Sequence, residues 1–500
     1  MDALARPSKP VRVLLDLRPA LDKHAGIPQQ TRLLFRGLSL TEGVCLEGLI
    51  QSSTHTLARG LPTDGRTFFG PLPHHRQIDR LGRVVIMLEQ KFLRSHVSWV
   101  PMLFRRLIGG AEALTRFDAT RFRDFIWRRL FARSLPPTDF NVVTSAGFRI
   151  ATVPWWSMHT GAMLTKYLGH AIFPRIDTNS IDIMISETPY PGIVAKGTRL
   201  VVRYHDAIPL LLPHTISDRL YHQGAHYRAL RSNVDSGADF VCVSEATRKD
   251  LLSIFPEVEG RSTTIHNIIS HDYFDEPSSP SRVHEIVRTR LNPRVAKTVD
   301  SAFKGTLSAT GNSVQICEYL LMVSTIEPRK NHLALLSAWE RVRTEYFPDL
   351  RLVLVGSLGW HQQTIVRKFL PWLHRGELCM LEDVPSSELR LLYKHARATI
   401  CPSFAEGFDL SGVEAMASGG VVVASDIPVH REIYADGAEY FNPYSVHELV
   451  AAIASVVRPE VTARRAALIE CGARVALRYS CEAILPKWRN FLAAKLKVLA

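Results

Sequence analysis

Two glutamates stand eight positions apart in the stretch SFAEGFDLSGVEAMASG, residues 403–419. The apolar run ATICPS leads into it and predicts a strand, and the residues after Gly412 predict a helix. A bare negative charge at such a turn needs a partner or a ligand, because an unpaired buried carboxylate is costly. Glu414 falls inside the predicted helix, whereas Glu406 lies on the loop before it. Glu406 is therefore the first candidate for a functional group.

The turn between the two glutamates predicts a helix start that also suits an anion. Ser411 and Glu414 have the spacing of a capping box, in which the serine accepts from an amide of the first turn and the glutamate reaches back to the first amide. Free amides at a helix N-terminus attract a phosphate, and Gly407 lets the backbone approach it closely. Phe408 and Leu410 complete this predicted anion-binding turn.

A second cluster, STIEPRKNH, covers residues 324–332 and also follows a predicted strand. Arg329 and Lys330 would neutralise a diphosphate, the arginine through its planar fork and the lysine as a point charge. Asn331 has the position to cap the helix that follows. A solvated turn would be the better explanation if this pair of cations stood alone.

Two further loops follow predicted strands. The loop VGSLGW brings Gly356 and Gly359 to a strand end, and LEDVPSSEL could present backbone groups around Val384 to a base. Because loops after parallel strands meet at one edge of the sheet, all four loops should lie together. Their glycines, cations and acids predict a site for a nucleoside diphosphate.

Other phosphate and metal sites fit the sequence poorly. It contains no GxGxxG fingerprint, and the segment Gly192–Thr198 lacks the lysine of a P-loop. There is no Asp-x-Asp pair and no Cys/His metal spacing. We therefore expect no metal, with the diphosphate charge offset by Arg329, Lys330 and helix amides.

The elements around these motifs predict two Rossmann-like α/β domains. In the C-terminal half, apolar strands alternate with amphipathic helices, as in a parallel, doubly wound sheet. The predicted strands there are 319–324, 350–356, 398–401 and 421–425, and the predicted helices are 331–346 and 386–396, the latter capped by its first serine. The N-terminal half shows the same pattern at 11–17, 181–186, 199–206, 239–247 and 262–267.

A chain of 500 residues is too long for one core. We assign 1–310 to an N-terminal domain, 317–480 to a C-terminal domain, and 481–500 to a helix that returns to the first domain. A polar linker is predicted at about 275–312, and an irregular basic insert at about 60–175.

Composition narrows the class of protein only slightly. With 46% hydrophobic and 22% charged residues this is an ordinary folded chain, and its net charge of +13 suggests an anionic partner. The seven cysteines form no CxxC pair, which favours a reduced, cytoplasmic setting. The N-terminus reads as a first strand and not as a signal peptide, and no run of about 18 apolar residues could span a membrane.

The basic insert leaves three interpretations open. Residues 103–133 hold eight arginines and three acidic residues. An interfacial helix on an anionic membrane would suit this composition, and so would a helix packed on the N-terminal domain with a solvated basic rim. A nucleic-acid-binding protein is the third, although no known motif accompanies the arginines. The apolar residues of one predicted helical face are Phe122, Phe125, Ile126 and Leu130, with Arg129 in their midst.

The motif EGFDLSGVEAMASGGVVVASDIPVHRE resembles the Glu-x7-Glu signature of retaining, family-4-type glycosyltransferases of GT-B fold. STIEPRKNH, VGSLGW and VSEATRKDLL resemble the companion motifs. The likeness is strong over about 317–450 and weaker at 11–40 and 199–270. It implies two Rossmann-like domains that face a central cleft, with the acceptor on the side of the N-terminal domain, 1–310, and the nucleotide sugar on the C-terminal domain, 317–480.

The resemblance also implies roles for single residues. Glu406 would lie beside the donor sugar and stabilise positive charge on it, while Glu414 would bind the ribose. Arg329 and Lys330 would bind the diphosphate. On the N-terminal side, the predicted residues are His205 facing the donor sugar, Asp206 after it, and Gly26 in the first loop.

Two positions depart from the family pattern. Asp409 stands where glycine is frequent and adds a negative charge near the phosphate turn, where it either points away or contacts a sugar hydroxyl. Ser324 also replaces a frequent glycine, which is a milder change.

By this resemblance we expect an enzyme that transfers a hexose, with retention and without metal, from a nucleotide sugar to a saccharide hydroxyl. It is similar to mannosyltransferases of bacterial surface polysaccharides, which favours GDP-mannose as substrate, no cofactor, and a polyprenyl-diphosphate-linked acceptor at the inner membrane face. An epimerase or hydrolase of sugar nucleotides on the same fold is the alternative enzyme.

Overall fold

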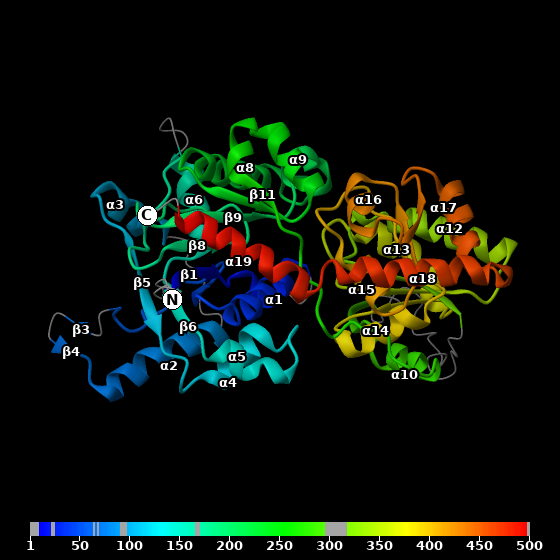
Figure 1. Cartoon of the computed structure of the whole chain (residues 1–500), viewed down its shortest axis with the longest axis horizontal. Helices are drawn as coiled ribbons and strands as arrows, with labels where there is room; N and C mark the ends of the chain where they lie inside the picture. The colour runs from blue at the N-terminus through cyan, green and yellow to red at the C-terminus, as the bar shows by residue number, and fades with distance from the viewer. Residues whose placement is uncertain are drawn as a thin grey trace, which may run out of the picture.

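The computed structural model describes two α/β domains that lie side by side along the long axis of the molecule (Figure 1). It describes residues 10–21, 26–63, 66–67, 70–90, 98–165, 171–295 and 318–497. These residues form a nine-stranded sheet, a six-stranded sheet and a two-stranded ribbon of β3 (Arg66–Thr67) and β4 (Gly70–Pro71). Helices pack around both large sheets, which confirms the predicted fold class of two Rossmann-like domains.

The N-terminal sheet has the strand order β11-β10-β9-β8-β1-β2-β6-β5-β7. All its pairings are parallel except that of β5 with β6. The central strands are nearly continuous apolar runs because helices bury both of their faces. The strands are β1 (Val11–Asp16), β2 (Val44–Gln51), β5 (Glu112–Phe117), β6 (Gly147–Ala151), β7 (Ile176–Asp177), β8 (Ile183–Ser186), β9 (Arg199–Tyr204), β10 (Asp239–Cys242) and β11 (Ser262–Thr264).

The C-terminal sheet has the order β14-β13-β12-β15-β16-β17 and is parallel throughout. Leu320 of β12 lies opposite Ala398 of β15, so the loops that follow these two strands are neighbours. The strands are β12 (Tyr319–Val323), β13 (Arg351–Val355), β14 (Leu378–Leu381), β15 (Ala398–Cys401), β16 (Val422–Ser425) and β17 (Ala438–Phe441).

The helices cover both faces of the sheets (Figure 1). Those of the first 295 residues are α1 (Ile27–Ser39), α2 (His74–Gln90), α3 (Trp99–Leu107), α4 (Arg123–Ile126), α5 (Phe140–Thr144), α6 (Trp155–Thr165), α7 (Ile208–Leu211), α8 (Arg219–Asp235), α9 (Glu245–Ile254) and α10 (Ser281–Thr289). Those after residue 318 are α12 (His332–Glu345), α13 (Gln363–His374), α14 (Ser386–His395), α15 (Leu410–Ala417), α16 (Pro428–Tyr434), α17 (Val446–Val457), α18 (Thr462–Leu477) and α19 (Cys481–Lys497).

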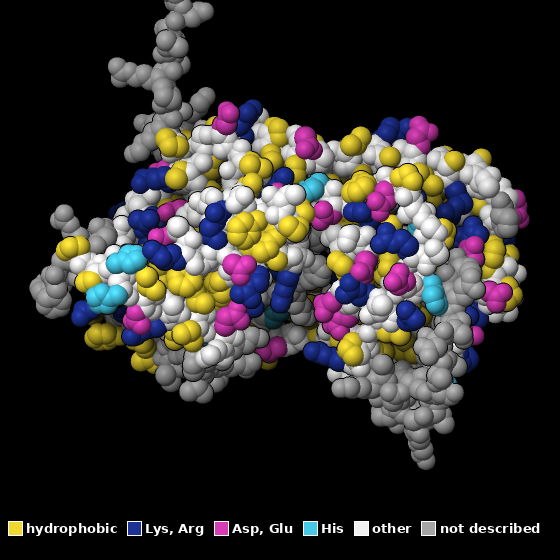
Figure 2. All heavy atoms as spheres, turned by 90° about the horizontal axis from the view of Figure 1, so that it is seen from below, with side chains coloured by type: hydrophobic (Ala, Val, Ile, Leu, Met, Phe, Trp, Pro, Cys, Tyr) yellow, Lys and Arg dark blue, Asp and Glu magenta, His cyan; other side chains and the backbone are white. Residues whose placement is uncertain are grey.

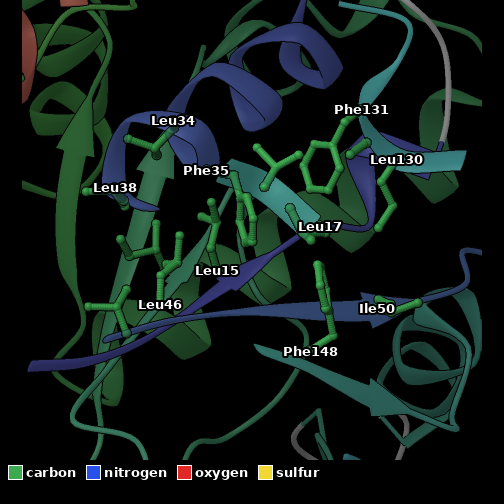
Figure 3. Packing of buried hydrophobic residues seen from close by; sticks show 14 of the residues in the cluster. Leu15, Leu17, Leu34, Phe35, Leu38, Leu46, Ile50, Leu130, Phe131 and Phe148 are labelled. Atoms are coloured by element: carbon green, nitrogen blue, oxygen red, sulfur yellow. The ribbon is translucent and has the colours of Figure 1, made fainter. Parts of the chain in front are cut away.

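The core of the N-terminal domain is a layer of leucine and phenylalanine side chains between α1 and the sheet. Figure 3 shows Phe35 of α1 between Phe131 and Phe148. The ring centroids lie 5.2 Å apart for Phe35 and Phe131 and 5.9 Å apart for Phe35 and Phe148. Leu130 belongs to the same cluster and is 1% exposed. The basic insert therefore supplies part of this core.

The segment 103–133 does not form the single amphipathic helix that both of its helical interpretations assumed. The segment is divided among α3, the strand β5, the short α4 and a π turn, Trp127–Phe131. Of the four apolar residues on the predicted helical face, Phe125, Ile126 and Leu130 are at most 6% exposed because the domain's own core covers them, and Phe122 is half-buried. The interpretation of a segment packed on the N-terminal domain is the one the structure shows.

Two segments join the domains outside the sheets. The last helix, α19, lies across the N-terminal domain (Figure 1), where Ile484 and Trp488 are fully buried in the cluster that contains Phe35. The helix α10, in the segment predicted as a linker, packs instead against α14 of the C-terminal domain. Each of these segments is thus packed on the domain opposite to the one that precedes it in the chain.

Charges of both signs are spread over the surface. In Figure 2, which shows the molecule from below, Lys and Arg side chains alternate with Asp and Glu side chains over both halves. The positive excess is therefore not gathered into one area of this face. Within the described ranges, no helix is both long and apolar enough to cross a membrane.

Candidate donor-binding site

The centre of the candidate site is Glu406, held between two cations. Arg329 Nη1 lies 2.8 Å from Glu406 Oε2, and Lys330 Nζ lies 2.5 Å from Glu406 Oε1. The two loops meet because β12 and β15 are neighbouring strands, although the residues are 76 and 77 positions apart in sequence. The structure thus brings together the acid and the two cations that the sequence placed at one sheet edge.

The cations keep Glu406 ionised. Burial alone would raise the pKa of this carboxyl, but the charges of Arg329 and Lys330 outweigh it and hold the pKa below its usual value. Glu327 lies 2.9 Å from Arg329, and there burial prevails and raises the pKa. Two acids therefore share the guanidinium, and their pKa values are shifted in opposite directions. Glu327 was visible in the motif STIEPRKNH, but its pairing was not predicted.

The turn after Glu406 differs from the predicted capping box. The helix α15 begins at Leu410, and Asp409 occupies the N-cap position with a φ of 59°, without a side-chain cap. The Ser411 hydroxyl donates to Asp409 Oδ1 at 2.7 Å instead of accepting from an amide. The prediction that Ser411 and Glu414 form a capping box is therefore wrong, because the left-handed residue moves the N-cap back by two positions, from Ser411 to Asp409. At α14 the N-cap is likewise Pro385, so the predicted serine cap is absent there too.

Asp409 points inward from this turn. His430 Nε2 lies 3.2 Å from Asp409 Oδ2, and the Tyr434 hydroxyl donates to Asp409 O at 2.9 Å. Burial opposes ionisation, but Lys330 and His430 hold the pKa of Asp409 far below its usual value. The extra negative charge is thus neutralised from within the domain, and His430, which the sequence did not suggest, contributes to this.

Glu414 has partners of another kind. Gln29 Nε2 donates to Glu414 Oε1 at 3.0 Å, and the Tyr393 hydroxyl donates to Oε2 at 3.1 Å. The residue is 5% exposed, and in the described part of the chain no cation is paired with it, so burial raises its pKa to about 7. Gln29 lies on α1, and this bond therefore crosses from one domain to the other. The atoms predicted to bind a ribose are engaged with these two side chains.

The N-terminal domain approaches the Glu406 loop through His205 and Asp206. A Cβ atom added to Gly407 would lie 1.8 Å from the carbonyl oxygen of His205 and 3.3 Å from Asp206 Cβ. Only glycine fits at this contact. The Ser244 hydroxyl also donates to Gly407 O at 2.7 Å. His205 and Asp206 are therefore placed beside the loop that carries Glu406.

His205 is largely buried, with 10% of its side chain exposed, and is held by an acid. Its Nε2 lies 3.1 Å from Glu187 Oε2, and burial lowers its pKa despite that contact. Because a carboxylate can only accept, Nε2 carries the hydrogen of the neutral ring and Nδ1 is left as an acceptor. Arg203 pairs with Glu187 at 3.3 Å and keeps the pKa of this acid low against the effect of burial. Neither partner was predicted.

The remaining predicted residues lie around the same edge. Gly356 passes so close to the neighbouring loop that an added Cβ would lie 2.1 Å from Ser324 O. Val384 is 4% exposed, with its side chain in the core. The ring of Phe408 packs against Tyr479, with the centroids 5.2 Å apart, so its backbone is the part that borders the turn. Gly26 has a φ of 74° at the start of α1.

A second interdomain contact was also missed. Both oxygens of Glu432 accept from the N-terminus of α9, from Glu245 N at 2.6 Å and Ala246 N at 2.8 Å. His266 Nε2 lies 2.9 Å from the same carboxylate. Acids are favoured at helix N-termini, so a partner of this kind for α9 could be expected. No sequence pattern, however, indicates that the acid comes from a helix of the other domain. Among the described residues, no three His, Cys, Asp or Glu side chains form a group that could hold a metal ion.

Comparison with known proteins relates the C-terminal domain to sugar-transferring proteins. The family model described as glycosyl transferases group 1 matches residues 312–474. The O-antigen chain mannosyltransferase B of Escherichia coli is 28% identical over 256 residues, which is 51% of this chain and 60% of that protein. The serotype-specific mannosyltransferase WbdA of Escherichia coli is 35% identical over 135 residues, or 27% of this chain and 16% of that protein. The chain thus spans less than two thirds of these relatives.

Solved structures share the fold along nearly the whole chain. The sucrose-phosphate synthase of Thermosynechococcus elongatus has a TM-score of 0.54 at 13% identity, with 97% of this chain and 100% of that chain covered. Anabaena HepE in complex with UDP-glucose also has a TM-score of 0.54, at 14% identity, with 97% and 99% covered. The two-domain arrangement is therefore that of the GT-B fold.

Proposed function

We propose that this chain, whose residues 312–474 are a group 1 glycosyl transferase domain, transfers a hexose from a nucleotide sugar to a saccharide hydroxyl with retention. The observation that carries the proposal is the cluster of Glu406, Arg329 and Lys330 at the strand ends. It offers two cations for a diphosphate beside an acid that stays ionised. A site with only a structural role would not need this charge at the edge of the sheet.

Each group has a distinct part in the reaction. Arg329 and Lys330 bind the diphosphate and stabilise the charge that grows on it as the sugar leaves, which is catalysis by fixed electrostatics and needs no metal. Glu406 faces the sugar and stabilises the positive charge at its anomeric carbon. The acceptor oxygen bonds to that carbon on the face the diphosphate leaves, and its proton passes to the departing phosphate oxygen.

The N-terminal domain completes the site from the other side. Neutral His205, fixed through Nε2 by Glu187, accepts a hydrogen bond from a sugar hydroxyl at Nδ1. Asp206 lies next to it beside Gly407. Glu414 binds the ribose once its bond to Gln29 opens. Donor entry is thus coupled to a movement of one domain against the other.

Mannose is the proposed sugar, with GDP-mannose as the donor and no further cofactor. The names of the relatives support it, since both are mannosyltransferases and one acts on the O-antigen chain. The acceptor is a growing, lipid-linked oligosaccharide of surface polysaccharide synthesis. The described cysteines are all free thiols, which fits the cytoplasmic setting we propose.

The test is transfer by the purified chain with GDP-mannose, UDP-glucose and dTDP-rhamnose, each with and without a mannose-terminated acceptor. NMR of the product gives the anomeric configuration, and EDTA tests for a metal. We expect an α-mannosidic product from GDP-mannose, insensitive to EDTA, and a loss of about 100-fold or more in Glu406→Gln. Glu439→Gln, which alters the remote pair of Glu439 with Arg464, is the matched control.

Three results would overturn parts of the proposal. Full activity of Glu406→Gln removes the catalytic assignment. An inverted product removes retention. Release of free or epimerised sugar, with no transfer in the presence of acceptor, indicates the alternative hydrolase or epimerase.

We propose a peripheral membrane contact only for the start of the segment 103–133, at the end of α3. Phe104, Leu107 and Ile108, at the end of α3, are 65%, 71% and 68% exposed, and they flank Arg105 and Arg106. Such a surface suits the interface of an anionic membrane. Burial of two such side chains contributes about 3 kcal/mol or more, so Phe104→Ser with Leu107→Ser should lower partitioning more than about 100-fold. Vesicles with and without phosphatidylglycerol measure it, with the equally exposed Leu477→Ser as control.

A further inference from the structure

A cavity of about 420 Å³ opens beside the candidate donor site, at the carboxyl ends of β15, β16 and β17. Its walls come from the three loops that follow these strands. The lining residues are Phe404, Asp426, Ile427, Asn442, Pro443 and Tyr444. None of the residues predicted to bind the donor is among them, so this cavity is a separate feature.

The most unusual part of the lining is an exposed aromatic ring. Tyr444 is 81% exposed, and its ring stacks on that of Phe404 with the centroids 5.1 Å apart and an angle of 28° between the planes. One face of the tyrosine is thus fixed by the phenylalanine. A supported aromatic face with water on its other side is a surface for an apolar ligand face, such as the C–H face of a sugar ring.

The polar groups of the cavity suit hydroxyls and not ions. The one charged lining residue, Asp426, accepts from Arg431 Nε at 2.6 Å and from Arg431 Nη2 at 2.7 Å, so its charge is balanced. Asn442 is exposed, and its Oδ1 accepts from Tyr444 N at 3.0 Å. No cation lines the cavity to attract a phosphate. A carboxylate and a carboxamide around an aromatic face can bind the hydroxyls of a neutral saccharide.

The position of the cavity fits the acceptor. The cation loop is the loop after β12 that carries Arg329 and Lys330. In the strand order β14-β13-β12-β15-β16-β17, the loops after β14 and β13, with Val384 and Gly356, lie on one side of it, and the cavity lies on the other side. A nucleotide bound across the loops after β14, β13 and β12 would direct its sugar toward the loop after β15. Phe404 is two residues before Glu406, a span of about 7 Å at most.

The cavity wall is also hydrogen-bonded to the cation loop. Phe404 N donates to Arg329 O at 2.9 Å. Asn331 Nδ2 donates to Pro402 O at 3.1 Å and to Pro443 O at 3.0 Å. The side chain of Asn331 thus joins two of the three cavity loops instead of capping α12. The cavity is fixed relative to the reacting groups.

We infer that this cavity binds a sugar unit of the acceptor saccharide, on an aromatic platform of Phe404 and Tyr444. The inference rests on the proposed function, since it assigns a second substrate region to the same enzyme. It places this region on the C-terminal domain, in addition to the acceptor side that the resemblance assigns to the N-terminal domain. The ligand is a neutral oligosaccharide. The sugar unit bound in the cavity is not the unit whose hydroxyl reacts but one further along the acceptor chain. The platform makes the enzyme prefer an acceptor long enough to reach it.

The test compares acceptors of two lengths in Tyr444→Ala and in Tyr444→Trp. We expect the KM for a linear α-mannotetraose to rise about tenfold in Tyr444→Ala, which corresponds to ~1.4 kcal/mol, with KM for methyl α-mannoside unchanged. Tyr444→Trp keeps the platform and should keep the KM for the tetraose. Tyr346→Ala, which removes an exposed tyrosine at the far end of α12, is the matched control.

Direct binding separates this inference from the proposed function. Saturation-transfer NMR of the full chain with mannotetraose should show contacts that disappear in Tyr444→Ala and persist in Tyr346→Ala. If the wild type transfers no sugar but shows these contacts, the proposed function fails and the platform stands. If transfer occurs and Tyr444→Ala alters neither the contacts nor the KM of the tetraose, the platform is overturned.

Discussion

Glu406 and Glu414 lie on one short stretch of chain, and their surroundings are opposite. Glu406 has two cations within 2.8 Å, which hold its pKa low. Glu414 has an amide and a phenol as partners, and burial raises its pKa to about 7. The side chains that hold each carboxylate are distant in sequence: those of Glu406 lie on the loop after β12, and those of Glu414 lie on α1 and α14. The same residue type is therefore a fixed anion at one position and a titrating group near neutral pH at the other.

The largest effect should follow from removing a cation from Glu406. In Lys330→Met, the site loses a partner of the diphosphate, and we expect kcat/KM to fall by about 100-fold or more. The charge of Lys330 also lowers the pKa of Glu406, so its loss should move the acidic limb of the pH–rate profile to higher pH. Rates measured from pH 4 to pH 9 test both effects. Lys368→Met, on the exposed side of α13, is the control, and an acidic limb that stays in place would contradict the assignment.

The next effect concerns the stability of the Glu414 region. Because burial raises its folded pKa from 4.5 to about 7, the folded state binds this proton more tightly than the unfolded chain does. The stabilisation is complete below pH 4.5 and is lost as the pH rises through 7. In Glu414→Gln, which imitates the protonated form, this loss should be absent. We expect the variant to gain about 1–3 kcal/mol relative to the wild type between pH 5 and pH 8. Urea unfolding at several pH values measures it, and parallel profiles would contradict it.

A smaller effect is expected from the interdomain partner of Glu414. Gln29→Ala removes the donor of the bond at 3.0 Å and should cost about 1 kcal/mol of the free energy of unfolding. It should also raise the pKa of Glu414 further, since that bond lowers it. A double-mutant cycle with Glu414→Gln isolates the pair, and Gln363→Ala on the surface of α13 is the control. A cycle without coupling would show that the two domains do not meet through this bond in solution.

Sequence patterns predict the parts of this molecule that depend on neighbouring residues. The strand predicted at 398–401 is observed at Ala398–Cys401, and that at 319–324 at Tyr319–Val323. Continuous apolar runs suffice for this because parallel strands are buried on both faces. The meeting of Arg329 and Lys330 with Glu406 also follows from strand-end loops sharing an edge. This regularity makes the C-terminal half easier to predict than the basic insert.

The misses have a common physical cause, which is contact between residues far apart in the chain. Glu414 lies 385 positions from Gln29, so no local pattern could indicate its partner. The apolar face around Ile126 fits a membrane as well as a core, and only the packing of Phe35 and Phe148 decides between them. Asp409 moved a helix start because its left-handed conformation is fixed by tertiary hydrogen bonds to its carbonyl and carboxylate.

The smallest effect should come from Glu432, the other carboxylate at the domain contact, and its pH dependence should have the opposite sign to that of Glu414. Burial opposes its ionisation, but the bonds from His266 and from the amides of Glu245 and Ala246 prevail and lower its pKa. Its stabilisation is therefore present above pH 4.5 and is lost as the pH falls below that value. In Glu432→Gln, we expect a loss of about 1 kcal/mol at pH 7, typical of an acid at a helix N-terminus.

At low pH, protonation of each carboxyl should make the wild type as stable as the corresponding glutamine variant, but from opposite directions. As the pH falls, the wild type loses stability relative to Glu432→Gln and gains stability relative to Glu414→Gln. Unfolding curves at pH 4, 5.5, 7 and 8 for both variants give the two signs in one series. If both profiles slope the same way, the contrast between an anion held by donors and a carboxyl held neutral by burial does not apply to this interface. Opposite slopes would show that the domains are joined by one contact that needs a charge and one that is weakened by it.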